Sequence, residues 1–347
     1  MATSTGLAAA SYHLKAISPI YAPASMIDAP LSINKYGYQT GRWDVGATSS
    51  KPMIANSTSS WFYPASPAWG EELVYAINDS FTAVGVGMSA SGVAQPLVWN
   101  YLSEPASFAL PPGATGAVAT SVNDANEIVG YVMYGSARSL PFRASPGSSL
   151  SLLGAPAGAT VTMIYGVDAA GEIVGTANGG PAGWSDAAYY TDAGGWVRLP
   201  MFPTAAAMGC GGLNAATAVR AGLVVGTSCR SVGFSVATGT IEIVQHAAMW
   251  KLGGLSPADL GALYADTTST ALALNASDEI VGQSGDGVSV WHGFLWTSGT
   301  MHDLDALLDV ASAGWHVTKA SSINDAGAIA AEAIYGGQTY AVQLTLD

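Results

Sequence analysis

The feature that most constrains the fold of this chain is a ten-residue phrase that occurs seven times along its 347 residues. Each copy opens with a small residue, continues through a short polar turn, and in five copies ends in Val-Gly. The third residue of the phrase, here called the anchor, is in turn Asn34, Asn78, Asn123, Asp168, Val219, Asn275 and Asn324. Successive anchors lie 44, 45, 45, 51, 56 and 49 residues apart, which matches the roughly 40–50 residues of one β-propeller blade.

The sixth copy shows how one repeat can form a sheet. Its predicted strands are residues 270–275, 279–284, 293–297 and 300–304. An Asn or Asp at the anchor can bond the backbone of the tight turn that follows. Gly282 falls inside the second strand, where a Cβ would crowd the neighbouring strand or the next blade. The sequence therefore predicts an all-β fold, a seven-bladed β-propeller of four-stranded antiparallel blades. A two-layer β-sandwich, the alternative, would not explain seven similar copies.

The two ends of the chain predict how the ring closes. After Asn324 only 23 residues remain, enough for two more strands at 328–333 and 339–345 but not for a third. Residues 11–20 contain a strand-like segment that resembles the fourth strand of the sixth repeat. We expect this segment to be the outer strand that completes the last blade, because closure removes exposed strand edges. Residues 1–347 would then form a single domain.

Composition excludes several classes of protein. A net charge of −13 with only 11 basic residues leaves no footprint for nucleic acid. Charged residues make up 10% of the chain and hydrophobic residues 49%, which disfavours both helical bundles and disorder. No apolar run is long enough to span a membrane. We expect a monomer that is secreted or located in the periplasm or cell envelope, with its signal peptide absent from this chain.

The repeat resembles the bacterial extracellular HAF-repeat family, named for a His-Ala-Phe tripeptide. The family pattern is roughly Ile-Asn-x-x-Gly-x-Val-Val-Gly, then His-Ala-Phe-Leu-Trp, then Gly-x-x-x-Asp-Leu-Gly. It is matched best at residues 274–282, 292–296 and 299–304, with Gly293 in place of the Ala. The resemblance covers nearly all of the chain as scattered repeat positions. It implies a propeller-like fold and an envelope location but little about activity, because repeat families host many functions.

Candidate ligand-binding residues lie where the chain departs from its own repeat. In propellers, ligands usually bind on the face built by the loops from strand two to three and from strand four to the next strand one. Aromatic rings there could stack on sugars, while nearby polar groups supply directional hydrogen bonds. The candidates are Trp43, Asp44, Trp69, Tyr131, Trp184, Asp186, Trp291 and Trp315. Packing between blades is the alternative role for the tryptophans.

A second set of residues could perform acid–base chemistry. Blades six, seven and one are neighbours across the ring closure, so we expect His292, His316, Glu332 and Arg42 to lie near one another. A His can act as a general acid or base near neutral pH when a carboxylate orients it, and Arg can bind a substrate carboxylate. His292 stands at the family's His position, where a packing role is the alternative.

The cysteines and acids give no metal-ligand pattern. Cys210 and Cys229 fall on neighbouring predicted strands, so a disulfide and two buried thiols both remain open. No Cys-x-x-Cys or His/Cys cluster is present. The acids next to the anchors are explained by Asx turns rather than by calcium binding. We therefore expect no metal site and no cofactor.

The favoured function is a binding module that recognises a glycan or small amphipathic ligand at the loop-rich face and channel mouth. The alternatives are an enzyme, a lyase or hydrolase with a His/carboxylate site at the channel mouth, and a protein-interaction scaffold.

Overall fold

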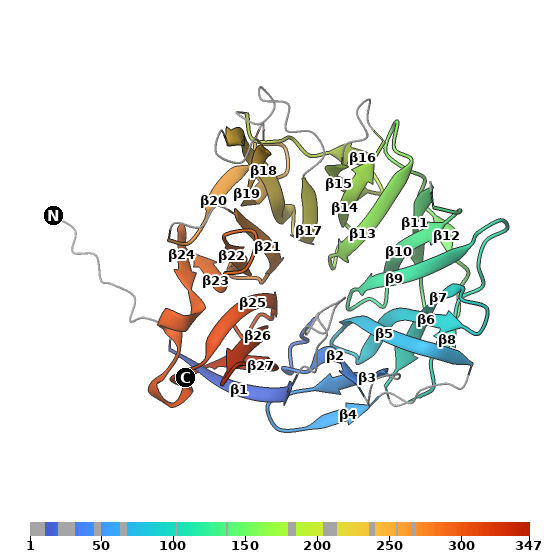
Figure 1. Cartoon of the computed structure of the whole chain (residues 1–347). Helices are drawn as coiled ribbons and strands as arrows, with labels where there is room; N and C mark the ends of the chain where they lie inside the picture. Colours follow the sequence, from blue (N-terminus) through green and yellow to red (C-terminus); the bar gives the residue numbers. More distant parts are fainter. Residues whose placement is uncertain are drawn as a thin grey trace.

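The structure, a computed structural model, describes residues 11–19, 32–44, 50–62, 68–101, 103–136, 138–179, 185–203, 214–235, 240–254, 256–264 and 268–347. Its strands form antiparallel sheets that radiate from a common axis (Figure 1). The prediction of an all-β propeller with four-stranded antiparallel blades is confirmed, and the sandwich alternative is wrong.

Within the described residues, six sheets have four strands each. The second and third repeats form β5 (Trp69–Ile77), β6 (Thr82–Ser89), β7 (Ala94–Asn100) and β8 (Ala106–Ser107), then β9 (Gly116–Val122), β10 (Ile128–Met133), β11 (Ser139–Ala144) and β12 (Ser151–Leu152). The fourth and fifth form β13 (Val161–Val167), β14 (Ile173–Asn178), β15 (Ser185–Thr191) and β16 (Gly195–Arg198), then β17 (Ala215–Arg220), β18 (Leu223–Ser235), β19 (Thr240–Lys251) and β20 (Ala258–Gly261). The sixth forms β21 (Thr268–Leu274), β22 (Ile280–Gly285), β23 (Trp291–Thr297) and β24 (Thr300–Asp303).

The first repeat departs from the predicted four strands. Its sheet contains β2 (Gln39–Asp44), β3 (Ser50–Ala55) and β4 (Ser60–Phe62), which follow the anchor. Directly before the anchor, the described residues form no strand. Ile33 instead makes an isolated antiparallel bridge to Gln39 in β2. The expectation of four strands in every blade is therefore wrong for this sheet as the structure describes it.

The N-terminal segment closes the ring as predicted. β1 (Tyr12–Pro19) pairs with β27 (Gln338–Leu346), which continues through β26 (Ile329–Tyr335) to β25 (His316–Ile323). The other edge of β1 is covered by the connection that contains the short 3-10 helices η1 (Leu304–Leu307) and η2 (Val310–Ser312). There the amide of Leu14 donates to Ser312 Oγ at 2.9 Å, and the amide of Asp309 donates to the carbonyl oxygen of Tyr12 at 2.8 Å. Both edges of the closing strand are thus engaged.

The glycine that ends the phrase is required by a β-bulge. In β21, the register shifts between Ala271 and Ala273, opposite Gly282. The bulge brings the carbonyl oxygen of Thr270 to 2.0 Å from where a Cβ on Gly282 would lie. A Cβ on the corresponding glycines would approach a carbonyl oxygen to 1.8–2.0 Å at Gly85, Gly130, Gly175 and Gly226. The prediction that a Cβ here would crowd the neighbouring strand is confirmed.

Each Asn or Asp anchor caps its own turn. Asn78 Oδ1 accepts hydrogen bonds from the amides of Ser80 at 3.0 Å and Thr82 at 2.9 Å. The same two bonds, from the residues two and four positions later, occur at Asn34, Asn123, Asp168, Asn275 and Asn324. The interpretation of these residues as Asx turns is confirmed.

The Asn anchors also link neighbouring repeats, in what we call the anchor belt. Each Nδ2 donates to the backbone carbonyl of the next anchor, over 2.9 Å from Asn324 to Asn34, 3.3 Å from Asn34 to Asn78, 2.9 Å from Asn78 to Asn123, 2.8 Å from Asn123 to Asp168 and 3.2 Å from Asn275 to Asn324. Asp168 has no amide donor, and its Oδ2 accepts from the amide of Ala221 at 3.0 Å instead. Asn therefore serves two roles, as turn cap and as link between blades.

We expect Asn78→Asp to lower the free energy of unfolding by about 1–3 kcal/mol. The carboxylate keeps the cap but sets an acceptor against the Asn123 carbonyl and Asn126 Oδ1, which Nδ2 of Asn78 now bonds. Urea unfolding measures the change. Asn56 is the matched control, because its Oδ1 caps the turn between β3 and β4 while it stands outside the belt. An equal loss in Asn56→Asp would contradict a specific role for the belt.

The described part of the chain contains no helix with the length and apolar character needed to cross a membrane. Cys229 is disulfide-bonded, and the chain's other cysteine, Cys210, lies outside the described residues.

Candidate functional site

The two ends of the ring differ in what they carry. In β21 and β22, Leu274 pairs with Ile280 beside the anchor turn, whereas Thr268 pairs with Gly285 at the far end. We call the end with the anchor turns the turn end. The opposite end, where the second strand leads to the third and one blade leads to the next, is the loop end.

A cavity of about 460 Å³ opens at the turn end. Anchors or residues beside them from all seven repeats line it, which places it at the centre of the ring. Its volume falls within the roughly 300–1,000 Å³ of small-molecule sites. This cavity lies at the end surrounded by the short, uniform anchor turns, opposite the loop-rich face where the sequence predicts ligand binding.

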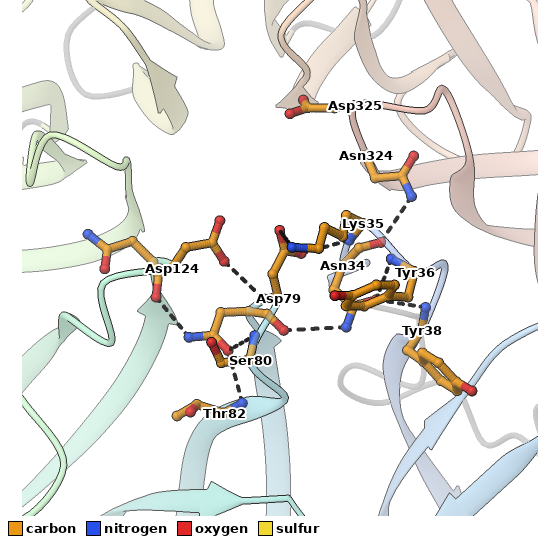
Figure 2. A network of polar contacts seen from close by, with 12 residues as sticks. Asn34, Lys35, Tyr36, Tyr38, Asp79, Ser80, Thr82, Asp124, Asn324 and Asp325 are labelled. Atoms are coloured by element: carbon orange, nitrogen blue, oxygen red, sulfur yellow. Dashed lines mark hydrogen bonds and ion pairs between the residues drawn. The ribbon is translucent and has the colours of Figure 1, made fainter.

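Charged side chains follow the anchors around this cavity (Figure 2). The amide of Lys35 donates to Asp79 Oδ1 at 2.8 Å, and the amide of Asp79 donates to Asp124 Oδ1 at 2.9 Å. Lys35 Nζ lies 3.4 Å from Asp79 Oδ2, and this carboxylate raises the pKa of the Lys35 ammonium above its ordinary value. On another part of the rim, Arg220 donates to Asp325 Oδ2 at 2.9 Å. The rim thus presents both cations and carboxylates, several of them oriented by backbone amides.

Beside this rim lies an aromatic cluster formed by Tyr36, Tyr38, Phe81 and Tyr101. The rings of Tyr36 and Phe81 stack with centroids 5.6 Å apart and an interplanar angle of 8°, and those of Phe81 and Tyr101 meet edge to face at 5.6 Å. Tyr36 is 55% exposed and Tyr101 57%. Lys35 Nζ lies 5.0 Å from the centroid of the Tyr36 ring, so the cluster adjoins the charged rim. This arrangement offers an apolar platform next to polar groups.

Two members of this cluster have strained backbones. Phe81 has φ of 60° and Tyr101 has φ of 37°. Phe81 occupies the fourth position of the anchor turn, where other repeats place Gly37, Asn126, Gly171, Asp278 and Gly327, all with positive φ. A bulky residue with left-handed backbone costs of order 1–3 kcal/mol, and such outliers gather at functional sites. The chain keeps an aromatic ring here at an energetic cost that Gly or Asn would avoid.

The loop end carries a different group, which we call the loop-end His cluster: His292, His316, Asp303, Asp305 and Tyr264. His316 Nδ1 lies 2.6 Å from Asp305 Oδ2, and the two imidazole centroids are 5.1 Å apart. Tyr264 donates its hydroxyl to Asp303 Oδ2 at 2.7 Å. His292 and His316 stand at the starts of β23 and β25, so packing between blades six and seven brings them together. Their predicted proximity is confirmed.

His316 is an imidazole oriented by a carboxylate. The hydrogen bond to Asp305 raises the pKa of this imidazole above its ordinary value, and a bond to the backbone of Trp291 acts in the same direction. A carboxylate partner of this kind stabilises the protonated ring and makes the imidazole more basic, which is the arrangement that general acid–base chemistry uses.

Of the other two predicted catalytic residues, Glu332 pairs with a lysine that is not part of this cluster. Glu332 lies opposite Lys319 in the β25–β26 ladder, and its carboxylate is 3.7 Å from the ammonium. Arg42 lies in β2, and its side chain falls outside the described part of the structure. The expectation that Arg42, Trp43 and Asp44 occupy a loop is wrong, because β2 extends through all three.

Most of the predicted ligand-binding residues that can be placed lie in strands rather than loops. Trp69 is in β5 and packs on the apolar cluster around Trp99. Tyr131 is in β10, where burial raises its pKa. Asp186 is in β15 and forms an ion pair with Arg198. The side chains of Trp43 and Asp44, and the whole of Trp184, are outside the described residues.

The other two predicted tryptophans, Trp291 and Trp315, lie at the loop end. Trp291 is the first residue of β23 and is partly buried. Trp315 stacks on Tyr335 at 4.9 Å and meets Tyr340 edge to face at 5.1 Å, against the core of the last blade. Trp69 and Trp315 therefore pack against other side chains, but the stacking partners of Trp315 lie in its own blade rather than between blades, as the alternative had it.

Sequence reasoning missed Tyr36, Phe81 and Tyr101. A signal was present: Phe81 stands where the repeat otherwise has Gly, Asn or Asp, and Tyr36 stands where other turns have Ala or Ser.

Comparison with known proteins supports the fold alone. No family model matches the chain, and no curated protein matches it. Among solved structures, the chain is similar to a puromycin hydrolase, with a TM-score of 0.54 and 10% identity over 94% of this chain and 54% of that one. It is also similar to a puromycin-hydrolyzing peptidase of Mycobacterium tuberculosis, with a TM-score of 0.50 and 11% identity over 92% of this chain and 49% of that one. The chain thus spans about half the length of these proteins.

Proposed function

We propose that this chain is a binding module that recognises a glycan or small amphipathic molecule at the turn end of the ring. One observation carries the proposal: an exposed aromatic cluster, held partly by strained backbone at Phe81 and Tyr101, lies beside a charged axial cavity. Phe81 also packs on the apolar cluster around Trp99, which offsets part of the strain; binding gives a reason to keep the exposed rings of Tyr36 and Tyr101 beside it.

The chemistry of this site fits a polyhydroxylated ring. The apolar face of a sugar can stack on the exposed rings of Tyr36 and Tyr101. Its hydroxyl groups can then donate to Asp79 or Asp124 and accept from Lys35, all of which line the adjoining cavity. A few convergent polar groups beside an apolar surface are typical of small-molecule sites.

The lyase or hydrolase alternative has weaker support. Its acid–base group would be His316, oriented by Asp305, but the axial cavity described above lies at the opposite end of the ring. The scaffold alternative is weakened by the same polar cavity, since protein-binding patches are broad and apolar.

We also propose that β2–β4 is the first blade of a seven-bladed ring. The belt supports this, because Asn324 bonds the Asn34 carbonyl and Asn34 bonds the Asn78 carbonyl, which sets the first repeat between the seventh and the second. Membership of the HAF-repeat family and a secreted or envelope location remain proposals that rest on the repeat pattern and the low charge of the chain.

A glycan array probed with the fluorescently labelled chain tests the binding proposal. We expect binding to a limited set of saccharides, and Tyr36→Ala to weaken it at least about tenfold, since one stacked aromatic contributes roughly 0.5–1.5 kcal/mol beyond its buried area. Tyr335→Ala is the matched control, because Tyr335 is 49% exposed but lies at the loop end.

Phe81→Asn separates binding from stability. Asn occupies the same turn position with φ of 60° at Asn126. Relief of backbone strain and loss of the packing of Phe81 on the cluster around Trp99 oppose one another, so the variant should fold with a Tm within a few degrees of the parent chain while losing saccharide binding. If the array showed no saccharide above background, or if Phe81→Asn and Tyr36→Ala bound as the parent chain does, the proposed site would be wrong.

A further inference from the structure

We propose that the loop-end His cluster binds a divalent transition metal ion, best fitted by Zn²⁺, through His292, Asp305 and His316. This site lies at the opposite end of the ring from the proposed ligand site, so neither proposal depends on the other.

The three side chains already converge. One ligand atom from each of His292, Asp305 and His316 can be chosen so that all three lie within 4.8 Å of one another. Zinc bonds of about 2.0–2.1 Å place tetrahedral ligand atoms about 3.4 Å apart, so a modest rotation closes the set. Room for that rotation exists, because the side chains of His316 and Asp305 are 36% and 30% exposed.

The ring of His292 is incompletely hydrogen-bonded without a metal. Its Nδ1 is buried and makes no hydrogen bond, although Asp303 Oδ2 lies 3.4 Å away. With a metal on Nε2, Nδ1 would carry the proton, and the charge of the metal would strengthen a hydrogen bond from Nδ1 to Asp303. Between His316 Nδ1 and Asp305 Oδ2, which are 2.6 Å apart, a cation would take the place of the shared proton.

The surroundings hold these ligands in place. The amide of Val317 donates to Asp305 Oδ1 at 2.7 Å and holds this carboxylate, while Oδ2 faces His316 Nδ1, on the side where a metal would bind. Asp303 is fixed on both oxygens, by the amide of Asp305 at 2.9 Å and by the hydroxyl of Tyr264 at 2.7 Å. Its carboxylate lies next to the His292 ring, the position of an outer carboxylate that orients a metal-bound imidazole.

The ligand set determines the class of metal. Two imidazoles and one carboxylate suit Zn²⁺ and similar transition ions, whereas Ca²⁺ and Mg²⁺ prefer all-oxygen sets. The sequence predicts no metal site because it contains no local metal-binding motif. These ligands are 13 and 11 residues apart and come together only because η1 turns the chain between β24 and β25.

Isothermal titration of the full chain with ZnCl₂, after chelation and dialysis, tests the proposal. We expect one Zn²⁺ per chain, binding weakened by more than about tenfold in His292→Ala and in His316→Ala, and by about 10–100-fold in the outer-carboxylate variant Asp303→Asn. The control is His246→Ala. His246 Nδ1 lies 2.8 Å from the carboxylate of Asp259, and its side chain is about as buried as that of His292.

Absence of stoichiometric Zn²⁺ binding, or an equal loss in His246→Ala, would overturn the proposal. If the variants fail to fold, the visible spectrum of the unaltered chain with Co²⁺ decides. Bands typical of imidazole-bound Co²⁺ would support the site, and a spectrum equal to that of Co²⁺ in buffer would exclude it.

Discussion

Deleting residues 1–19 is expected to abolish cooperative folding of the whole ring, although the deletion removes only one outer strand. β1 forms seven residue pairs with β27. Tyr12 is fully buried and Leu14 is 5% exposed, both in the apolar cluster that joins blades six and seven. Burying such side chains contributes about 1.5–3 kcal/mol each, and the ladder adds more. The sum is comparable to the net stability of about 5–15 kcal/mol of a typical domain.

The deletion also exposes the edge of β27 and the η1–η2 connection that β1 covers. An uncovered edge strand invites aggregation. We expect insoluble protein or a broad transition at much lower temperature, measured by circular dichroism and light scattering. Deleting only residues 1–10 keeps β1 and serves as the control. A sharp, unshifted transition in the longer deletion would show that the ring does not depend on its closing strand.

Gly282→Ala is expected to destabilise the chain by about 3 kcal/mol or more, whereas Gly41→Ala should change stability by less than about 1 kcal/mol. Both glycines end the same phrase. A Cβ at Gly282 would lie 2.0 Å from the carbonyl oxygen of Thr270 and 2.8 Å from the Phe294 ring. Among the described residues, the nearest atom to a Cβ at Gly41 is Met53 Cε at 3.8 Å, an ordinary contact. No described residue of the first repeat forms the bulge that crowds Gly282.

Equilibrium unfolding in guanidinium chloride of both variants measures this contrast. Because the residue change is the same, differences in propensity cancel to first order. If the two variants lost equal stability, the bulge would not be the reason for the glycine.

The repeating architecture could be predicted from the sequence because its causes are local. The anchors and the glycines recur with the period of one blade. The Asn and Asp anchors cap their turns, and the glycines of repeats two to six sit where a Cβ would clash, as the pattern indicates. The closing strand was predictable because blade seven lacked a strand and residues 11–20 offered one.

The sites were less predictable because their causes are not local. The anchor belt depends on the Nδ2 of Asn78 reaching a carbonyl 45 residues later, which no turn rule contains. The axial cavity depends on how the seven turns meet, and the loop-end His cluster on the bend at η1. Trp69 and Trp315 were predicted to bind a ligand. The sequence does not show that Trp69 lies inside a strand, or that Trp315 packs against the core of the last blade.

The central claim is that the turn end, and not the loop end, binds the ligand. Hydroxyl-radical footprinting with mass spectrometry, with and without the strongest saccharide from the array, tests it most directly. If the ligand binds at the turn end, it will protect Tyr36 and Tyr101 from oxidation and leave the oxidation of Trp291 and Tyr335 unchanged. Protection of Trp291 and Tyr335, with Tyr36 and Tyr101 oxidised as before, would place the ligand at the opposite end of the ring and contradict the account.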